Sequence, residues 1–172
     1  MAVVGGMEYL LSGGYDGRVK MWDQTSVGLM TTVPVQHINI LAYEEGEIVS
    51  LCYLPKLTDD EAIITGNNDG TLKVFRVYDG KLMSTVQYEN IGIYSLAYDA
   101  CFLFAGMETG EITIWNCASL GNTYHLSTFT AHDGVVADLI FQLDHIMSCS
   151  SDGSIRVWKY EEGNSQCQYE VK

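Results

Sequence analysis

His132, Ser148 and Asp152 are the residues of this 172-residue chain whose types could do chemistry together. Serine, histidine and aspartate make a catalytic triad, in which the histidine takes the serine proton and the aspartate orients the histidine. One well-known setting for such a serine is a G-x-S-x-G turn between a strand and a helix. Neither Ser148 nor the nearby Ser150 has that surrounding sequence, so the three residues call for another explanation.

A metal or cofactor site is not expected. The five cysteines contain no C-x-x-C pair, and the four histidines are scattered without the spacing of zinc ligands. The glycine-rich stretches GGYDG and GNNDG recur at equivalent positions of a repeat, which indicates hairpin turns rather than phosphate-binding loops.

The chain is strongly acidic, with a formal net charge of −13 and a pI near 4.4. Nucleic-acid affinity comes mostly from Lys and Arg side chains that neutralise phosphates, so no nucleic-acid partner is expected. No stretch approaches the roughly 20 apolar residues of a membrane helix, so no membrane association is expected. The odd cysteine count and the lack of an Asn-x-Ser/Thr sequon favour a reducing compartment, the cytoplasm or the nucleus.

One pattern recurs four times without gaps. The matching segments are LLSGGYDGRVKMWD (10–23), IITGNNDGTLKVFR (63–76), LFAGMETGEITIWN (103–116) and IMSCSSDGSIRVWK (146–159). Their turn glycines are spaced 53, 40 and 43 residues apart, and an aromatic residue follows each glycine by five positions. A period near 40 residues indicates a repeat architecture.

Each repeat predicts four strands. A short apolar run precedes a glycine turn, mostly Asp-Gly, and an alternating polar and apolar segment follows it, as in a hairpin. A further strand is predicted before this hairpin in the later repeats, at 47–54, 92–99 and 135–142. A fourth strand is predicted after it, at 28–35 in the first repeat. Every unit is therefore expected to be a four-stranded antiparallel meander, without helices.

These segments resemble WD repeats, the blades of a β-propeller, over essentially the whole chain. The resemblance implies an all-β fold with about four blades, spanning roughly residues 1–36, 37–88, 89–131 and 132–172. It implies an open arc or part of a larger ring, because rings of WD repeats normally close with six to eight blades. The first blade is expected to lack most of its first strand.

In this family, a histidine, a Ser or Thr, the turn Asp and the Trp of the third strand form a buried hydrogen-bonded chain. The resemblance assigns this structural role to His132, Ser148, Asp152 and Trp158 in the last repeat, Ser12, Asp16 and Trp22 in the first, Thr65 and Asp69 in the second, and Trp115 in the third. Phe75 replaces the tryptophan of the second repeat, where Glu44 lies near the histidine position. Ala105, Thr109 and Glu89 replace the polar partners of the third. A structural chain with degraded copies is preferred to a catalytic triad.

The resemblance also indicates a binding surface on the top face, formed by residues before the turn Asp and near the start of each first strand. These are Tyr15, Asn68, Glu108 and Ser151, together with Glu45, Glu47, Asn90, Asp133 and Val135. The set is acidic to polar, so a basic peptide is one interpretation and ordinary loop tips are the other. Two acidic segments, 35–47 and 57–62, are interpreted as an insert and a solvated loop.

We expect a non-enzymatic scaffold that binds proteins or peptides, because nothing in the residues requires a catalyst. The alternative is a regulatory or targeting portion of a larger enzyme, such as a ubiquitin ligase or a kinase. Four blades leave an apolar face exposed at each end, at a cost of about 1.5–3 kcal/mol for each large side chain. Further blades are therefore expected from a longer chain or from a second copy.

Overall fold

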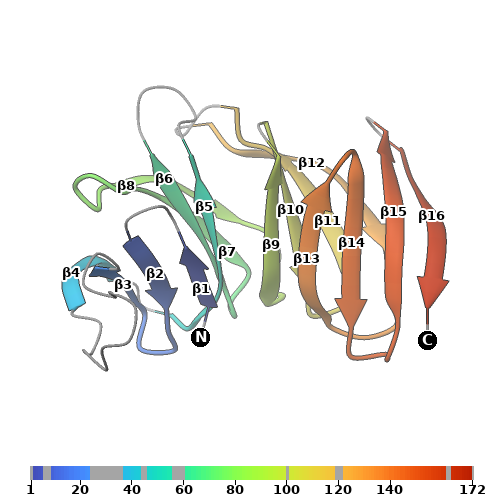
Figure 1. Ribbon diagram of the computed structural model, residues 1–172, viewed down its shortest axis with the longest axis horizontal. Helices are drawn as coiled ribbons and strands as arrows, with labels where there is room; N and C mark the ends of the chain where they lie inside the picture. Colours follow the sequence, from blue (N-terminus) through green and yellow to red (C-terminus); the bar gives the residue numbers. More distant parts are fainter. Residues whose placement is uncertain are drawn as a thin grey trace, which may run out of the picture.

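A computed structural model of the chain describes residues 2–5, 9–23, 37–43, 46–55, 61–99, 101–118, 122–161 and 164–171. All regular elements within these ranges are β-strands, and they form four separate four-stranded antiparallel sheets (Figure 1). Each sheet is one blade, and its strands lie side by side in chain order. The expected all-β meander architecture is confirmed.

The bounds of the strands follow the repeat closely. Blade 1 contains β1 (Ala2–Gly5), β2 (Tyr9–Gly13), β3 (Arg18–Asp23) and β4 (His37–Tyr43). Blade 2 contains β5 (Ile48–Leu54), β6 (Ala62–Asn67), β7 (Thr71–Arg76) and β8 (Leu82–Gln87). Blade 3 contains β9 (Ile93–Asp99), β10 (Phe102–Met107), β11 (Glu111–Asn116) and β12 (Tyr124–Thr130). Blade 4 contains β13 (Val136–Gln142), β14 (His145–Ser150), β15 (Ile155–Glu161) and β16 (Asn164–Val171).

Blade 1 differs from its prediction at both ends. β1 pairs with β2, from Ala2 opposite Gly13 onwards, so the first strand that we expected to be mostly lacking is formed. The fourth strand is β4, which pairs with β3, so the blade boundary after residue 36 was wrong. The sequence HINILAY alternates polar and apolar residues as a strand does, although it lies in the segment that we interpreted as an insert. The strand predicted at 28–35 lies outside the described residues.

Glycine builds the turn between the second and third strands of every blade. Gly17, Gly70, Gly110 and Gly153 have φ angles of 69°, 82°, 89° and 85°. In each turn the glycine N–H donates to the carbonyl oxygen three residues earlier, at 3.0–3.2 Å. Glycine adopts this left-handed conformation without a steric penalty, which explains why the repeat places it there.

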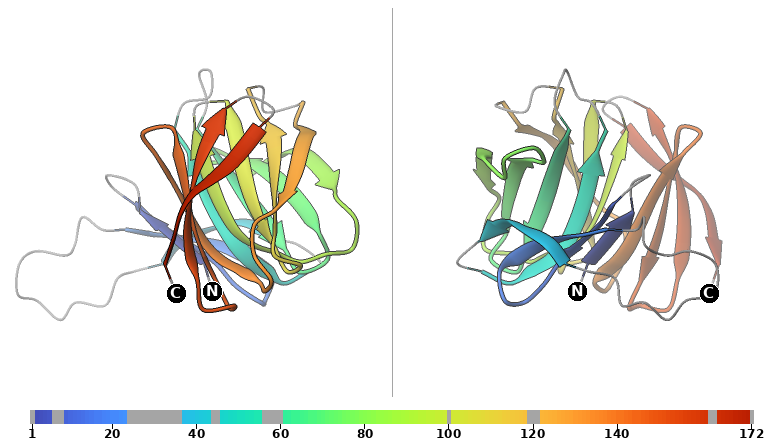
Figure 2. Two further views of the ribbon diagram at one scale, coloured as in Figure 1. Left: turned by 90° about the vertical axis from the view of Figure 1, so that its right-hand side faces the viewer. Right: turned by 60° about the vertical axis from the view of Figure 1, so that its left-hand side comes forward.

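The blades pack face to face around their first strands. β1 contacts β5, β5 contacts β9 and β9 contacts β13. Figures 1 and 2 show the sheets fanned around these inner strands, with blades 1 and 4 at the two ends. Each blade therefore has a front face, which packs on the following blade, and a back face, which packs on the preceding one.

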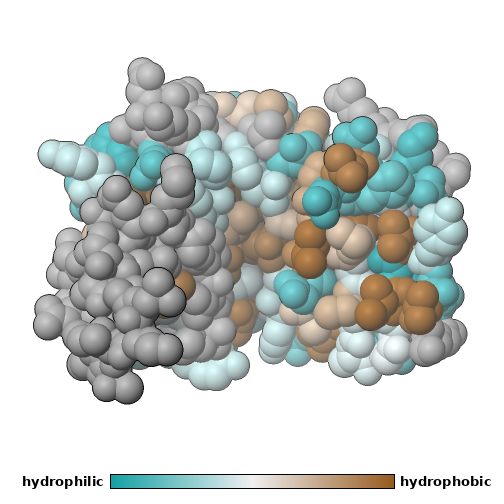
Figure 3. Space-filling model, viewed as in Figure 1, coloured by the Kyte–Doolittle hydropathy of each residue, from teal (hydrophilic) through white to brown (hydrophobic). Residues whose placement is uncertain are grey.

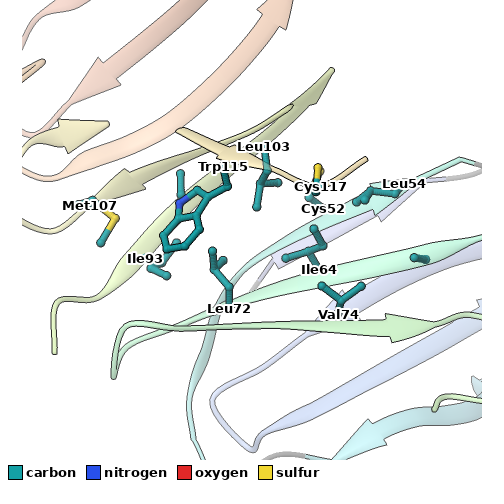
Figure 4. Packing of buried hydrophobic residues seen from close by; sticks show 12 residues of the cluster. Cys52, Leu54, Ile64, Leu72, Val74, Ile93, Leu103, Met107, Trp115 and Cys117 are labelled. Atoms are coloured by element: carbon teal, nitrogen blue, oxygen red, sulfur yellow. The ribbon is translucent and has the colours of Figure 1, made fainter. Parts of the chain in front are cut away.

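Apolar clusters fill the spaces between consecutive blades. Between blades 2 and 3, the front-face residues Ile64 and Leu72 share a cluster with Leu103 and Trp115 from the back face of blade 3 (Figure 4). The repeated aromatic of the third strand thus covers the preceding blade. Fully burying one such large side chain contributes about 1.5–3 kcal/mol, so each blade depends on its neighbour.

Two of the cysteines fill this same cluster. Cys52 and Cys117 are buried between blades 2 and 3. Burial raises the pKa of the Cys52 thiol to about 12, and burial also raises the pKa of Cys117 to about 12. Both thiols therefore stay protonated at neutral pH and pack as small apolar groups.

Candidate functional site

The four residues predicted to form a hydrogen-bonded chain in blade 4 lie together. Trp158 Nε1 donates to Ser148 Oγ at 2.9 Å, and Ser148 Oγ lies 2.7 Å from His132 Nε2. On the other side of the imidazole ring, His132 Nδ1 lies 3.2 Å from Asp152 Oδ2. The chain of hydrogen bonds links β15, β14, the segment before β13 and the β14–β15 turn.

The donors and acceptors of this chain fit a neutral histidine. Ser148 Oγ accepts the Trp158 N–H, which leaves the serine O–H free to donate to His132 Nε2. The ring proton then lies on Nδ1 and is donated to Asp152, with Ser154 Oγ also 3.0 Å away. Every member of this largely buried chain has a partner, as buried polar groups require.

Asp152 also holds the turn in place. Its Oδ1 accepts the hydroxyl and the backbone N–H of Ser154, at 2.7 and 2.8 Å, and its Oδ2 accepts the Asp133 N–H at 3.1 Å. The Ser154 hydroxyl first, and then these backbone donors and His132, hold the pKa of Asp152 well below its usual value, against the opposing effect of desolvation. The carboxylate is thus ionised and saturated with donors.

This arrangement is poorly suited to triad chemistry. A nucleophilic serine must reach its substrate, and Ser148 is only 1% exposed. Its oxygen is also engaged by the indole of Trp158. The alternative candidate Ser150 accepts the backbone N–H of Asp152 at 3.1 Å and is no part of the chain to Trp158. The geometry is that of a structural link between strands.

Blade 1 contains a shorter version of this link, and blade 2 keeps the hydrogen bonds of the turn aspartate. In blade 1, Trp22 Nε1 donates to Ser12 Oγ at 2.8 Å. The Asp16 carboxylate accepts the backbone N–H of Arg18 at 3.3 Å and forms an ion pair with Lys20, also at 3.3 Å. In blade 2, Asp69 Oδ1 accepts the backbone N–H and the hydroxyl of Thr71, at 3.0 and 2.7 Å. Thr65 is fully buried on β6, where it pairs with Lys73. Glu44, near the missing histidine position, lies outside the described residues.

Blade 3 uses a residue that the sequence analysis missed. Trp115 Nε1 donates at 2.8 Å to the hydroxyl of Thr113 on its own strand. Thr113 pairs directly with Ala105, which occupies the place of the serine found in blades 1 and 4. The signal was present in the repeat alignment, because the other repeats carry a lysine or arginine where this repeat has Thr113.

In blades 2 to 4 a backbone hydrogen bond ties the predicted turn residue to the residue before the first strand, which belongs to the predicted set in blades 2 and 4 but is Gly92 in blade 3. The N–H groups of Asn68, Glu108 and Ser151 in the turns donate to the carbonyl oxygens of Glu47, Gly92 and Val135, at 3.2, 2.9 and 3.1 Å. Each turn is thereby tied to the segment that enters the first strand of the same blade. Most of the named side chains are exposed, including Asn90 and Asp133, and Val135 is partly exposed.

Neighbouring blades continue this surface. A Cβ added at Gly70 would lie 2.7–3.0 Å from backbone atoms of Tyr88, Glu89 and Ile91, so the turn of blade 2 lies against the entry to blade 3. Gly110 lies in the same way against His132 and Gly134 at the entry to blade 4. The turns form one edge of the arc, with the β14–β15 turn at the lower edge of Figure 1.

Acidic side chains dominate this edge. Glu47, Glu108 and Asp133 are exposed, and Asn68 Nδ2 donates to Glu47 Oε2 at 3.0 Å. Tyr15, 66% exposed in the turn of blade 1, adds an aromatic surface. Glu45 lies outside the described residues. Within the part of the chain that the structure describes, no three His, Cys, Asp or Glu side chains are grouped so as to bind a metal ion.

The described segments also contain no helix that is long and apolar enough to span a membrane.

Comparison with known proteins identifies the repeats. The family model "WD domain, G-beta repeat" matches residues 2–23 and 123–159. The DDB1- and CUL4-associated factor 13 of Dictyostelium discoideum is 30% identical over 94 residues, which cover 52% of this chain and 20% of that protein. The chain spans only about a tenth to a fifth of the curated relatives that it matches.

Two solved structures share the fold. The computationally designed Ika4 protein superimposes with a TM-score of 0.72 at 22% identity, covering 93% of this chain and 90% of that one. The computationally designed Ika8 protein superimposes with a TM-score of 0.70 at 23% identity, covering 92% of this chain and 45% of that one. Both are designed β-propellers, so the propeller fold expected from the repeats is confirmed.

Proposed function

The chain is a WD-repeat β-propeller protein, and from this premise we propose that it is a non-enzymatic scaffold that binds partner proteins or peptides through its top face. The carrying observation is that the turns and entry segments of consecutive blades lie at one edge, tied together by backbone hydrogen bonds. A rigid framework thus presents exposed side chains from several blades at once. Binding residues are commonly placed on such loops.

The proposed partner is a peptide segment rich in Lys and Arg. Glu47, Glu108 and Asp133 supply exposed carboxylates, and Tyr15 supplies an aromatic face over which a cation can lie. The net charge of −13 adds a long-range attraction for basic segments and a repulsion for polyphosphates. The repulsion of polyphosphates disfavours nucleic acid as the partner.

A binding experiment with charge variants tests this proposal. Fluorescent peptides of matched length, one set rich in Lys and Arg and one rich in Asp and Glu, are titrated with the protein at low and high salt. We expect the basic set to bind, more weakly at high salt, because exposed charges are screened. The Glu108→Gln, Asp133→Asn double variant should weaken binding several-fold. Asp144→Asn, in the β13–β14 turn at the opposite edge, is the control for removing a carboxylate away from the top face, and it is compared with the single variants Glu108→Gln and Asp133→Asn. Preference for the acidic set would overturn the electrostatic part.

The second candidate is that this propeller is the targeting or regulatory portion of a larger enzyme, such as a ubiquitin ligase or a kinase. The supporting observation is that the chain spans only a small part of its curated relatives. Reading the transcript on both sides of this sequence tests it, because a catalytic domain in frame would support this candidate over a free-standing scaffold. In either case we place the protein in the cytoplasm or nucleus, which imaging of the tagged protein would check.

A further inference from the structure

The front face of blade 4 is built like the internal front faces, but it is exposed. At the equivalent position of the third strand, Val19, Leu72 and Ile112 are 0%, 1% and 0% exposed, whereas Ile155 is 54% exposed. The three buried residues each pack against the following blade. Ile140 on β13 is 54% exposed as well. Blade 4 thus presents the apolar surface of a blade junction without its partner.

This surface continues across the sheet. Val171 lies opposite Ile155 and Tyr169 lies opposite Val157, and Val171 and Tyr169 are 65% and 67% exposed. Met147 on β14, partly exposed, has the place that Phe104 has in the junction between blades 3 and 4. Figure 3 shows apolar side chains exposed on the side of the molecule where blade 4 lies. Extended apolar patches of this kind mark interaction surfaces.

The other end of the arc carries the complementary surface. Leu10 and Trp22, at the back-face positions of blade 1, are both partly exposed. Their equivalents in blade 4, Ile146 and Trp158, are 0% and 6% exposed because they pack on blade 3. The chain therefore carries both halves of one repeating junction, one half at each end.

We propose that a second copy of this chain occupies these surfaces, with the front face of blade 4 of each copy docked on the back face of blade 1 of the other. Two such contacts close a ring of two copies. The superposition on the larger design fits a ring of this size, because 92% of this chain matches only 45% of that propeller and leaves space for a second arc of similar size. The contact extends a junction that the chain already uses three times.

Two residues of blade 4, Cys149 and Asp138, differ in type from their equivalents at the internal junctions. A Cβ added at Gly66 or Gly106 would lie 2.7 or 2.6 Å from Ile93 or Val136 of the following blade, so glycine lets the inner strands approach closely. Cys149 has this place in blade 4, where it adds a side chain that the glycines lack. The junction between copies therefore relies on the outer apolar side chains.

The serine that donates a hydrogen bond across each of two internal junctions is an aspartate in blade 4. Ser50 and Ser95 donate to the carbonyl oxygens of Ile93 and Val136 at 2.7 and 2.9 Å, across the internal junctions. Asp138 has the equivalent position in blade 4, where a carboxylate accepts and does not donate. We therefore expect a contact weaker than the internal junctions, so that the two-copy ring forms reversibly with concentration.

Sedimentation velocity over a range of concentrations tests the proposal. Wild-type protein should reach the mass of two copies, whereas Ile155→Glu and Leu10→Glu, each altering one face, should remain at the mass of one. Tyr78→Glu, on the exposed β7–β8 turn, is the control that keeps pairing. An equimolar mixture of Ile155→Glu and Leu10→Glu should again form a two-copy species, because one junction in the mixed pair has two intact faces.

A single-copy mass for the wild type at all concentrations would overturn the proposal, and so would two copies in Ile155→Glu. Species larger than two copies would overturn the closed ring. The thiol-labelling rate of Cys149 gives a readout that needs no variant. It should fall several-fold as wild-type protein is concentrated, while the exposed Cys101 keeps its rate. An unchanged Cys149 rate counts against the contact.

Discussion

Thr113 accepts the indole N–H of Trp115 at 2.8 Å, from two residues away on the same strand. In blades 1 and 4 the equivalent hydroxyl comes from the neighbouring strand, as Ser12 and Ser148. Ala105, the equivalent of these serines, pairs directly with Thr113. The acceptor hydroxyl of blade 3 therefore comes from the residue opposite the usual serine position. The tryptophan N–H has a hydroxyl acceptor in all three blades, and this hydroxyl can come from either the second or the third strand of the blade.

Removing this hydroxyl should destabilise blade 3. Thr113→Val keeps the shape of the side chain but leaves the Trp115 N–H buried without an acceptor, which costs about 1–3 kcal/mol. Urea unfolding measures the loss as a lower midpoint at unchanged slope. Adding Ala105→Ser to this variant should recover much of the stability, because that hydroxyl would have the place of Ser148. A failure of this rescue would show that Thr113 stabilises the blade through packing instead.

Ser148 should matter more than Ser12. Ser148→Ala deprives both Trp158 and His132 of a partner in a buried site, and should cost about 2–4 kcal/mol. Ser12→Ala deprives only Trp22, which is partly exposed, and should cost about 1–2 kcal/mol. Ser151→Ala, on the exposed turn, serves as the control with little effect. Equal losses for Ser12 and Ser148 would contradict a role for the histidine in the link.

The repeat pattern made much of the fold and of blade 4 predictable. A glycine at positive φ and an aromatic five residues later are local requirements, so they recur in the sequence at fixed spacing. β4 was misplaced because the repeat register ends the blade near residue 35, and only pairing with β3 shows that 37–43 completes it. Thr113 was missed because its role follows from cross-strand pairing with Ala105. The exposed state of Ile155 depends on which blades are present, so it follows from the number of repeats and not from the local pattern around Ile155.

Two turn glycines with the same backbone conformation should respond differently to alanine. Gly110 and Gly153 have φ angles of 89° and 85°, so alanine imposes a similar backbone strain of about 1–2 kcal/mol at each. A Cβ at Gly153 meets nothing within 4 Å, whereas at Gly110 it would lie 2.2 Å from the carbonyl oxygen of His132. Gly110→Ala should therefore cost about 1–3 kcal/mol more. Thermal unfolding of both variants checks this, and matching losses would mean that the contact between the two blades is absent.

Asp152 should make stability depend on pH in the acidic range. Donors from Ser154, Asp133 and His132 hold the pKa of this carboxyl in the folded protein below its ordinary value of 3.8. As the pH falls through the ordinary value, the unfolded chain binds a proton on Asp152 before the folded chain does, so the free energy of unfolding decreases. The contribution is complete above about pH 5 and is lost progressively below it.

Asp152→Asn should therefore lower stability at neutral pH and flatten the decrease between about pH 5 and pH 2. Urea titrations across this range measure the slope of the unfolding free energy against pH. Asp144→Asn removes one carboxylate from the opposite edge of the same blade and controls for the change in net charge. If both variants show the wild-type slope, the donors around Asp152 do not favour its ionised form, and the charge in the structural link has no energetic role.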